Sequence, residues 1–555
     1  MPWLLPTRTE PWTTFYADAL AAAVWLSLTA SLLATTTRSA LPAALTGRGV
    51  ALDLLPALAL ALMLVAGLQA FSGRLVFASE AVLVGAHLAA FAGAAVLGRH
   101  CRELVGETFT HLLWTSLIAA ALLSAGIGVA QWLKVEPLDW LTPPADVDGR
   151  AIANVGQANH LATLICWGLL GLWQARLRGQ LGPWITALAA AFLAFGLALT
   201  QSRTPWVGAV VLFAVAVLGH RALGGRRTLW ALLALVAFYV LSWQAMAEVS
   251  EALGLTAPRD AADQTSAGFR PTIWAIAVAA IAERPWLGWG WNQFGVAWVA
   301  LAPGRLAIPS PNGYAHNLVL DLLVWNGVLI GGLVVAVLLG WMWRMLRAAR
   351  SAEQWLLLAG VGVFGVHALL ELPHAYLLML LPVAGMMGVL SACAPLPPLA
   401  RLRRRWVAGA GLGLAALLAL IVRDYHGLEA DHQALRLKDA GLLIQTPHAP
   451  SQPIVLRWMA EANATLQARP AQNMTAEELT RLRRTLARYP NAGGLARYAQ
   501  ASALHGDAAG AAWALHTLCG LQRRAVCEAA LREWQTFAAR HPEAPVVAMP
   551  QPAAR

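Results

Sequence analysis

Residues 317–339, NLVLDLLVWNGVLIGGLVVAVLL, form an apolar run in which Asp321 is the only charged residue. A helix needs about 20 mostly apolar residues to cross the hydrocarbon core of a bilayer, so this run predicts a membrane-spanning helix. A long polar segment, residues 247–315, comes before it and leads into His316. Titratable groups at the edge of a membrane are costly and are usually retained for a function. We therefore predict a membrane helix with a functional site at its start.

Composition extends this prediction to most of the chain. Of 555 residues, 58% are hydrophobic and 12% are charged, whereas a soluble domain carries roughly 25% charged residues. The first helix is expected to remain, because the N-terminus lacks the basic-then-apolar pattern of a cleaved signal peptide. The predicted fold class is all-α, a polytopic membrane helix bundle of about 12 transmembrane helices. The predicted spans are residues 16–36, 49–70, 76–98, 109–132, 158–175, 182–200, 204–219, 228–247, 317–343, 353–370, 375–394 and 406–423.

Arginines in the short loops predict the orientation in the membrane. Short basic loops face the cytoplasm, which places residues 133–157, the loop 248–316 and the C-terminal tail on the opposite side, with the N-terminus. The net charge of +11 is then mostly a topology signal. The arginines form no single basic stripe, so no nucleic-acid partner is expected. The cytoplasmic arginines are Arg38, Arg48, Arg99, Arg102, Arg176, Arg178, Arg221, Arg226, Arg227, Arg344, Arg347, Arg350, Arg401, Arg403, Arg404 and Arg405.

After residue 423 the chain becomes polar, and no apolar run is long enough to span a membrane. Small and apolar residues recur at helical spacing, which resembles a tetratricopeptide-like array of paired helices that binds or orients a partner. The predicted domains are therefore residues 1–423, a transmembrane domain that includes the loop 248–316, and residues 424–555, a helical domain on the side opposite the cytoplasm. Cys519 and Cys527 lie in this tail. Two interpretations stay open, a disulfide in an oxidising compartment or two buried thiols.

Two polar clusters interrupt the apolar runs on the predicted outer side. Residues 149–163, GRAIANVGQANHLAT, hold Gln157, Asn159 and His160 at the start of a hydrophobic helix. Capping of free N–H groups explains one such side chain, but several together favour a functional site. Arg203 stands in a short turn between two apolar helices. It is either a snorkelling side chain or a bidentate partner for phosphate oxygens, and the second interpretation is favoured.

Two further clusters lie on the same side. Arg270 comes just before a predicted amphipathic helix, whose N-terminus favours anions, and the tryptophans after that helix are expected to anchor at the membrane interface. His316 can accept a proton near neutral pH, although a histidine at a helix start is often only a cap. Glu371 and Tyr376 lie at a turn where Pro373 breaks the helix, and a tyrosine there would also fit an interfacial belt.

Together these segments resemble the bacterial membrane glycan ligases, a superfamily that includes the O-antigen ligases and the pilin-type protein O-oligosaccharyltransferases. GQANHLA and the helical tail resemble the protein-glycosylating branch more than the lipopolysaccharide branch. The family pattern has an acidic residue near the middle of the helix that begins with His316-Asn317, the His-Asn helix, and the resemblance assigns that place to Asp321. The matching segments are GQANHLA (156–162), SRT (202–204), GFRPTIW (268–274), RPWLGWGWNQF (284–294), HNLVLDLLVWNGVLIG (316–331) and ELPHAY (371–376).

The resemblance implies a GT-C-like glycosyltransferase of the bacterial inner membrane, with its active site and tail facing the periplasm. The donor would be an oligosaccharide on undecaprenyl diphosphate, and the acceptor a serine or threonine hydroxyl of a periplasmic, pilin-like protein. Transfer would be en bloc and inverting, with no metal and no cofactor. Asp146-Val147-Asp148 spells a DxD-like metal motif, but a solvated turn is the favoured interpretation.

The resemblance also implies residue roles that agree with the chemistry. Arg203 and Arg270 would supply positive charge to the departing diphosphate, since stabilising the charge that develops in a transition state is often the largest catalytic contribution. His316 would remove or orient the proton of the acceptor hydroxyl. The residues expected to bind substrate are Gln157, Asn159, His160, Arg284, Asn317, Glu371 and Tyr376.

Three other functions stay open. A lipopolysaccharide O-antigen ligase uses the same donor with a lipid A-core acceptor, and a related polymerase extends the glycan itself. A transporter or flippase with a helical accessory domain is the alternative from another class. Such a transporter should carry interrupted helices in matching halves, whereas here the polar groups gather at one face.

Overall fold

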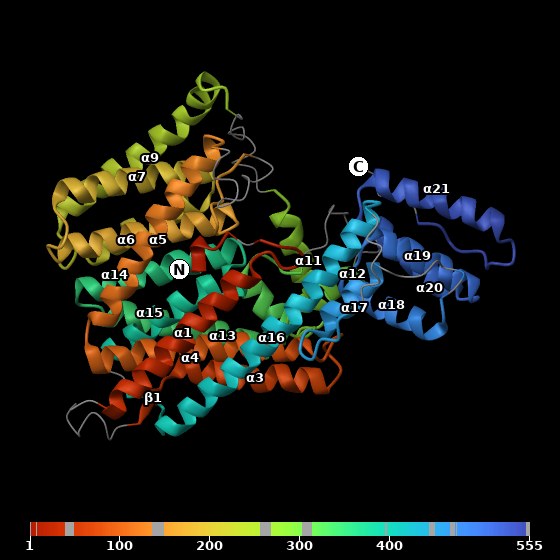
Figure 1. Cartoon of the computed structure of the whole chain (residues 1–555), viewed down its shortest axis with the longest axis horizontal. Coiled ribbons are helices and arrows are strands. Elements are labelled where there is room, and N and C mark those ends of the chain that lie inside the picture. Colours follow the sequence, from red (N-terminus) through yellow and green to blue (C-terminus); the bar gives the residue numbers. More distant parts are fainter. Residues whose placement is uncertain are drawn as a thin grey trace. The chain divides into compact units, whose positions relative to one another are not determined.

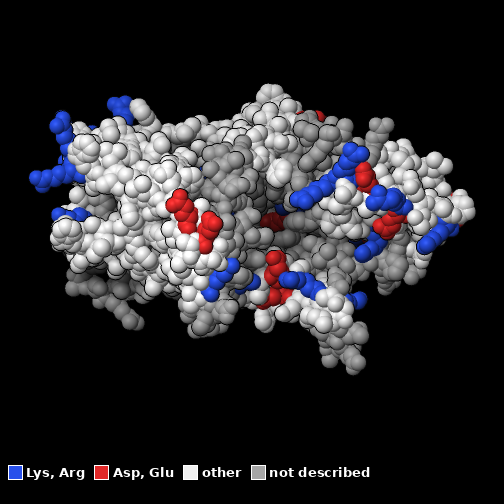
Figure 2. Space-filling view, turned by 90° about the horizontal axis from the view of Figure 1, so that it is seen from above, with Lys and Arg blue, Asp and Glu red and all other residues white. Residues whose placement is uncertain are grey.

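The computed structural model of this protein describes residues 2–6, 8–38, 49–135, 149–255, 268–301, 313–394, 397–442, 450–466, 472 and 474–550. Nearly all of these residues lie in helices, and the only sheet in this part of the chain is one pair of short strands (Figure 1). Figure 2 shows wide uncharged areas on one face, with charged side chains in small groups. The chain is a helical membrane protein with several spans, as its composition predicts.

The elements follow one another along the chain as follows: η1 (Pro2–Leu4), α1 (Phe15–Arg38), β1 (Val50–Leu52), α3 (Leu54–Phe71), α4 (Glu80–Val105), α5 (Thr108–Trp132), α6 (Ala158–Leu177), α7 (Pro183–Thr200), α8 (Thr204–Leu218), α9 (Arg226–Ala252), α11 (Arg270–Glu283), α12 (Phe294–Leu301), α13 (Leu318–Ala348), α14 (Ala352–Leu370), η3 (Pro373–Ala375), α15 (Leu377–Cys393), β2 (Ala400–Leu402), α16 (Arg404–Asp439), α17 (Arg457–Leu466), α18 (Ala476–Arg488), α19 (Ala492–Leu504), α20 (Ala508–Leu521) and α21 (Arg524–Arg540).

The chain divides into two compact units, and each is described by itself below. Unit 1 consists of Met1–Leu62, Ala86–Ser266 and Val337–Ala419. Unit 2 consists of Met63–Gly85, Ala267–Ala336 and Leu420–Arg555.

Nine helices of the described residues are long and apolar enough to cross a membrane: α1, α3, α4, α5, α7, α9, α13, α14 and α16. The predicted spans 204–219 and 375–394 correspond to the shorter apolar helices α8 and α15. The predicted span 158–175 corresponds to α6, whose first turn carries Asn159 and His160 and is therefore less apolar. The count of about twelve spans stays a prediction.

One predicted span begins later than expected. Residues 50–52 form β1, which pairs antiparallel with β2 so that Val50 lies opposite Leu402, and α3 begins only at Leu54. The two short strands satisfy each other's backbone N–H and C=O groups, which must be paired when they are buried. The prediction of a helix from residue 49 is therefore wrong for its first residues. Apolar composition alone does not separate a short buried strand from the start of a helix.

Small residues allow the helices of unit 1 to pack closely around α6, which contacts α5, α7, α8 and α14. A β-carbon added at Gly168 in α6 would overlap the side chain of Ala121 in α5, and membrane helices associate through such close approaches. The indole N–H of Trp167 donates to the carbonyl of Gly360 in α14 at 3.0 Å. This packing fixes the direction in which the polar first turn of α6 points.

Ion pairs occupy one end of these helices. Arg102 at the end of α4 lies 3.1 Å from a carboxylate oxygen of Glu353 at the start of α14. Arg178, just after α6, pairs with Glu107, just before α5. Loops that the arginine pattern assigns to one side of the membrane thus meet at one end of unit 1. That this end is cytoplasmic stays a prediction.

In unit 2, α13 is broken at Gly327, where φ is 68° and ψ is 178°. Glycine adopts positive φ without a steric penalty. The N–H of Val328 donates to the carbonyl of Pro285 at 2.7 Å, and a β-carbon at Gly327 would overlap the backbone of Trp286. The Gly-Trp turn that follows α11 therefore docks on α13 where the helix breaks.

The helices α18 to α21, blue in Figure 1, pack around one apolar core. The side chains of Thr475, Asn491 and Asp507 each accept a backbone N–H at the start of α18, α19 and α20, as N-cap residues do. Their membership of a tetratricopeptide-like class stays a prediction. α16 runs unbroken from Arg404 to Asp439, so the boundary predicted at residues 423–424 falls within a helix.

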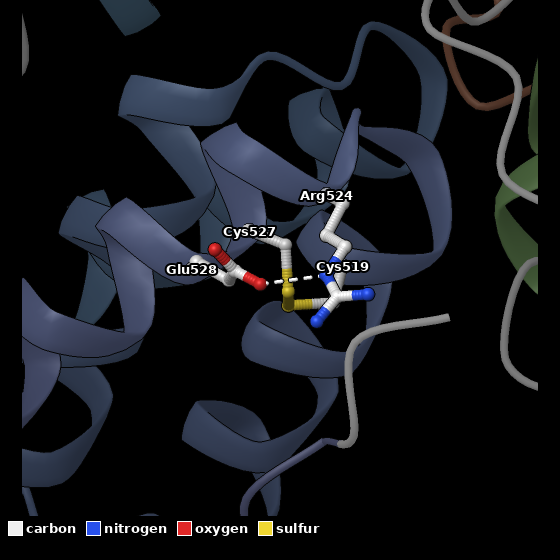
Figure 3. Close-up of a disulfide and its surroundings, with 4 residues drawn as sticks. All are labelled: Cys519, Arg524, Cys527 and Glu528. Carbon is white, nitrogen blue, oxygen red and sulfur yellow. Dashed lines mark hydrogen bonds and ion pairs between the residues drawn. A yellow bond between two sulfur atoms is a disulfide. The ribbon is translucent and has the colours of Figure 1, made fainter. Parts of the chain in front are cut away.

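Cys519 and Cys527 form a disulfide, the first of the two interpretations left open by the sequence (Figure 3). Their Cα atoms lie 4.8 Å apart, within the usual range for a disulfide. The bond joins the end of α20 to the first turn of α21, beside an ion pair between Arg524 and Glu528.

Candidate functional site

Three of the four polar clusters seen in the sequence meet at one end of unit 1. We name Asn159, His160, Ser202, Glu371 and Tyr376 the amide–histidine cluster. They come from the start of α6, the turn between α7 and α8, and the turn between α14 and α15. The 20 residues of α6 span about 30 Å between this cluster and the end that carries the ion pairs. The arginine pattern therefore assigns the cluster to the outer side.

Asn159 lies at the centre of the cluster. Its side-chain N–H donates to Glu371 Oε1 at 3.1 Å, and its Oδ1 accepts from the hydroxyl of Ser202 at 2.5 Å. Ser202 Oγ in turn accepts the backbone N–H of Thr204 at 3.1 Å. Asn159 is not the cap of α6, because the N-cap position is Gln157 and no side chain caps the helix there. Asn159 instead joins three turns that are far apart in the sequence.

Arg203 follows Ser202 in the chain and occupies the N-cap position of α8. Its carbonyl accepts the N–H of Trp206 at 3.1 Å, so the backbone of this turn is fixed on one side by α8. On the other side Ser202 is fixed by Asn159. Arg203 is thereby held next to the amide–histidine cluster, a position compatible with the predicted phosphate-binding role.

His160 is only 1% exposed, and neither of its ring nitrogens has a hydrogen-bond partner among the described residues. Its ring packs edge-to-face against Tyr376, with centroids 4.4 Å apart, and lies 5.2 Å from the ring of His367. Gln157 Oε1 is also buried with no partner in the described part of the chain. Buried polar atoms are nearly always hydrogen-bonded, so these atoms are suited to a bound substrate group or an ordered water.

Sequence reasoning missed several polar residues around this cluster. Asp18 in α1 accepts the N–H of Leu378, in the first turn of α15, at 3.0 Å. His367 shares a 2.8 Å hydrogen bond with the hydroxyl of Thr163. His367 could have been found, because it is a titratable residue within an apolar run, one helical turn before the end of α14. Asp18 is an acidic residue within an apolar run, which is also a usable signal.

Two further arginines were not predicted as site residues, because only the fold brings them to the amide–histidine cluster. Arg150 Nη2 lies 3.5 Å from Asn159 Oδ1, and its Nε donates to the carbonyl of Thr200 at 3.0 Å. The guanidinium of Arg8 lies against Gly156, where a β-carbon would overlap it. The chain before α1 gives no local pattern that predicts this contact.

The surroundings of Tyr376 keep its phenol protonated. Burial, together with the carboxylates of Asp18 and Glu371, raises the pKa of Tyr376 to about 12, and the nearby Arg8 guanidinium opposes this shift. A protonated phenol is both a hydrogen-bond donor and an acceptor. Tyr376 can therefore donate to a sugar or acceptor oxygen at any physiological pH.

His316 belongs to unit 2 and lies just before α13. Its φ of 53° is left-handed, which is uncommon for a residue other than glycine. Asp321 Oδ1 accepts the N–H of Ala315 at 2.7 Å, and Asn317 Oδ1 accepts the N–H of Val319 at 3.0 Å. Asp321 thus shapes the turn that presents His316, while Asn317 caps α13. Backbone strain of this kind gathers at functional sites.

The arginines of the third cluster also lie in unit 2. Arg270 is the first residue of α11, not the residue before it, and the Arg284 guanidinium lies 3.9 Å over the ring of Trp289. The predicted interfacial anchoring fits Trp286, which is 63% exposed, but is wrong for Trp289 and Trp291, which are 5% and 7% exposed. These two indoles turn inward because α11 and α13 offer a backbone acceptor and a stacking partner.

The DxD-like motif Asp146-Val147-Asp148 lies outside the described residues. Within the described ranges no group of three or more His, Cys, Asp and Glu side chains could hold a metal ion.

Comparison with known proteins places this geometry in context. The family model of the O-antigen ligases matches residues 188–337, and a model described as the C-terminal part of a virulence factor membrane-bound polymerase matches residues 355–523. The chain is 29% identical to a general O-oligosaccharyltransferase of Acinetobacter baylyi over 540 residues, 90% of this chain and 87% of that protein.

Two further relatives match over shorter stretches. A ComP-specific O-oligosaccharyltransferase of the same organism is 28% identical over 252 residues, 44% of each chain. An O-antigen ligase of Pseudomonas aeruginosa is 31% identical over 202 residues, 34% of this chain and 47% of that protein. The first family model contains the segments SRT, GFRPTIW, RPWLGWGWNQF and HNLVLDLLVWNGVLIG, and the second contains ELPHAY. The chain belongs to the bacterial superfamily of membrane glycan ligases that contains the O-antigen ligases and the protein O-oligosaccharyltransferases.

Proposed function

We propose that this chain is a protein O-oligosaccharyltransferase. It moves an oligosaccharide as one unit from undecaprenyl diphosphate to a serine or threonine hydroxyl of a periplasmic, pilin-like protein. One observation carries this choice. Similarity to the general O-oligosaccharyltransferase extends over 90% of the chain, and so includes most of the helical tail, whereas similarity to the O-antigen ligase covers 34%.

The proposed location is the bacterial inner membrane, with the amide–histidine cluster and the tail on the periplasmic side. Two observations support this orientation. The arginine-rich loops gather at the end of unit 1 opposite the cluster, as the positive-inside rule expects for a cytoplasmic end. The tail carries the disulfide between Cys519 and Cys527, a bond that persists in oxidising compartments such as the periplasm.

The proposed reaction is a direct displacement at the anomeric carbon. The acceptor oxygen forms a bond to this carbon, the bond from the carbon to the diphosphate oxygen breaks, and undecaprenyl diphosphate leaves. His316 takes the proton of the acceptor hydroxyl as general base. The left-handed backbone of His316 and the hydrogen bond from the Ala315 N–H to Asp321 hold the turn at His316 in one defined conformation. Displacement of this kind inverts the anomeric configuration, and a product with retained configuration would refute it.

Positive charge is what the leaving diphosphate requires, and guanidinium groups supply it without a metal. Arg203 and Arg270 have this role in the proposal, and Arg284 and Asn317 are further substrate contacts. Gln157, Asn159, His160, Glu371 and Tyr376 bind sugar or acceptor, since their polar atoms lie together and some of them have no partner in the described chain. Transfer that is unaffected by EDTA is expected.

Intact-mass analysis of a periplasmic pilin-like acceptor tests the proposal. Cells that make a lipid-linked oligosaccharide would express the acceptor with wild type, His316→Ala or His220→Ala. His220 is exposed and lies just after α8, at the opposite end of that helix from Arg203, so it serves as the matched control. Wild type and His220→Ala should add a glycan-sized mass to serine or threonine, and His316→Ala should not.

Lipopolysaccharide ligation is the second candidate, because the O-antigen ligase model matches residues 188–337. An unmodified acceptor with wild type, together with restored O-antigen on lipid A-core in a ligase-deficient cell, would replace the proposal with this candidate. A lengthened lipid-linked glycan with neither product would instead indicate a polymerase.

A further inference from the structure

Helix α1 carries a single buried charge near its start. Asp18 is the only charged residue in Phe15–Ala34, the part of α1 that is long and apolar enough to cross a membrane, and it is 3% exposed. A carboxylate in such a helix is costly and is usually retained for a function. The proposed reaction gives Asp18 no part, so the reason for burying this carboxylate lies in what it contacts.

Both oxygens of the Asp18 carboxylate have partners. Oδ1 accepts the backbone N–H of Leu378 at 3.0 Å, and Oδ2 accepts the hydroxyl of Thr14 at 3.0 Å. The carboxylate also interacts with the backbone N–H of Leu377. Leu377 and Leu378 are the first two residues of α15, and N–H groups at a helix start have no acceptor within their own helix. Asp18 thus caps α15 from a neighbouring helix.

The N-cap residue of α15 does not cap the helix itself. That position is held by Tyr376, whose side chain makes no capping hydrogen bond, whereas most N-cap residues carry a short side chain with an acceptor oxygen. The phenol of Tyr376 packs against the ring of His160 instead, with centroids 4.4 Å apart. Asp18 therefore supplies the missing acceptor and leaves the Tyr376 side chain to the amide–histidine cluster.

Helix packing holds Asp18 at the start of α15. A β-carbon at Gly385 in α15 would overlap the indole ring of Trp25 in α1, and Trp25 also packs edge-to-face against Phe109 in α5. Trp25 follows Asp18 by seven residues. Their contacts in α15, Gly385 and Leu378, are also seven residues apart and in the same order. The two helices therefore run parallel and meet at two points about two turns apart.

The backbone of Tyr376 is fixed on both sides. Its N–H donates to the carbonyl of Pro373 at 3.2 Å, and its carbonyl accepts the N–H groups of Met379 and Leu380 at 3.1 and 2.9 Å. Asp18 interacts with the two N–H groups that lie between these contacts in the chain. Because a side chain adopts only a few staggered rotamers on a fixed backbone, the cap helps to fix where the Tyr376 phenol lies.

We propose that Asp18 is a positioning residue for substrate binding, whose carboxylate caps α15 from α1 and so holds the Tyr376 phenol in place against the ring of His160. The inference deepens the proposed transferase function, in which Tyr376 and His160 bind sugar or acceptor, and rests on it. It makes α1 a part of the site, although this helix lies outside both matched family models.

Hydrogen exchange tests the cap without any substrate. Asp18→Leu removes the acceptor and keeps a side chain of similar size that suits a membrane helix. In the full chain in phosphatidylcholine nanodiscs, the amides of Leu377 and Leu378 should then exchange about tenfold faster than in wild type. Asp18→Asn keeps an acceptor oxygen and should exchange within about threefold of wild type. Ser27→Leu, at an exposed position of α1, is the matched control. Unchanged exchange in Asp18→Leu would overturn the inference.

A double-variant comparison tests whether the cap acts through Tyr376. In the transfer assay, Asp18→Leu should lower kcat/KM about tenfold or more, and Asp18→Asn should keep most of it. In a Tyr376→Phe background, which lacks the hydroxyl, Asp18→Leu should cost less than about threefold more, because residues that act as a unit are non-additive. A fully additive loss, or a Tyr376→Phe variant that transfers as wild type does, would leave Asp18 with only a structural role and overturn the inference.

The two assays also separate this inference from the proposed function. Wild type that transfers the glycan, with Asp18→Leu unchanged in both assays, would remove Asp18 from the site and leave the transferase function in place. Wild type that transfers no glycan would overturn the proposed function and the positioning role together. Thermal unfolding sets an assay temperature at which every variant is folded, and Asp18→Ala replaces Asp18→Leu if leucine prevents folding.

Discussion

His316 is held by neighbours that perform no chemistry themselves. The carboxylate of Asp321 is fully buried and accepts the N–H of Ala315, one residue before His316. Asn317 fixes the other side of the turn by capping α13. A general base works only when it lies within hydrogen-bond reach of the proton that it removes. Asp321, the acidic residue of the His-Asn helix, is therefore a positioning residue for His316.

Asp321→Asn should therefore slow transfer without weakening donor binding. An amide presents one acceptor oxygen but no charge, so the Ala315 hydrogen bond weakens and His316 is displaced. Misplacement of a catalytic group by about 1 Å costs roughly 100-fold in rate. The expected result is a large fall in kcat with donor KM nearly unchanged, measured by glycan transfer at varied donor concentration. A raised KM with an unchanged kcat would contradict the positioning role.

Tyr376 makes the stability of unit 1 depend on pH at the alkaline end. Its pKa is raised to about 12, chiefly by burial, from an ordinary value of about 10. The folded state therefore holds this proton more tightly than the unfolded state does. The contribution of the protonated Tyr376 phenol to the free energy of unfolding is present in full below pH 10 and is lost as the pH rises through about 12. Tyr376→Phe should remove this part of the pH dependence, measured as the difference in thermal unfolding between wild type and variant at pH 8 and pH 11.

At the scale of elements, the break in α13 is the feature that shapes unit 2. Two successive N–H groups of the Gly-Trp turn, those of Trp289 and Gly290, donate to the carbonyls of Val324 and Trp325, just before the break. Gln69 in α3 adds a hydrogen bond to the Trp325 carbonyl at 3.2 Å. The carbonyls at the end of the first half of the helix thus find partners outside the helix, as buried backbone groups must.

Gly327→Ala should destabilise the protein, whereas Gly332→Ala in the same helix should not. Alanine at 327 would need positive φ and would overlap the backbone of Trp286, at a cost on the order of 3 kcal/mol. A β-carbon at Gly332 meets nothing within 4 Å, and alanine gains about 0.5–1 kcal/mol in a helix interior. Thermal unfolding of both variants in detergent checks this. Equal melting temperatures would show that the break does not depend on glycine.

At the scale of the whole molecule, the tail is joined to the rest of unit 2 by a buried charge. Glu80, at the start of α4, accepts from Arg488 Nε at 3.1 Å and from the hydroxyl of Tyr489 at 2.6 Å. Its second oxygen accepts from Gln293 at 2.8 Å. Tyr489 also stacks on Phe77, with ring centroids 6.2 Å apart. Deleting residues 424–555 would therefore cut α16 and leave this carboxylate buried without its cation.

Point variants test the role of the tail more cleanly than a deletion does. Arg488→Ala breaks a buried ion pair, which costs about 3–5 kcal/mol when one partner stays behind. We expect α18 to loosen, with faster proteolysis of the tail and loss of transfer to protein. Arg481→Ala, in the same helix, breaks an exposed pair with Glu477 that is worth under about 1 kcal/mol. Arg481→Ala should match wild type in both assays. If the two variants have equal effects on proteolysis and on transfer, the Glu80 junction, which is the set of contacts of Glu80 with Arg488 and Tyr489, is not the cause of those effects.

The sequence by itself determined the class of this protein, because composition and apolar run length are local properties that a bilayer constrains strongly. It also determined the superfamily, through segments such as GQANHLA and the His-Asn helix, and it singled out Asn159, His160, Arg203 and Glu371. These residues stood out because polar groups at the ends of apolar helices are costly. The same reasoning predicted that the loops before and after α6 would lie at opposite ends of the bundle.

Only the tertiary structure decided which distant residues meet. The Arg8 contact with Gly156, the bond from Asp18 to Leu378 and the Glu80 junction each join segments far apart in the chain. No periodicity or spacing encodes such pairs, because they result from how whole helices pack. The inward turn of Trp289 and the strand at Val50 were mispredicted for the same reason: an apolar side chain satisfies lipid and protein interior equally well, and only packing decides between them.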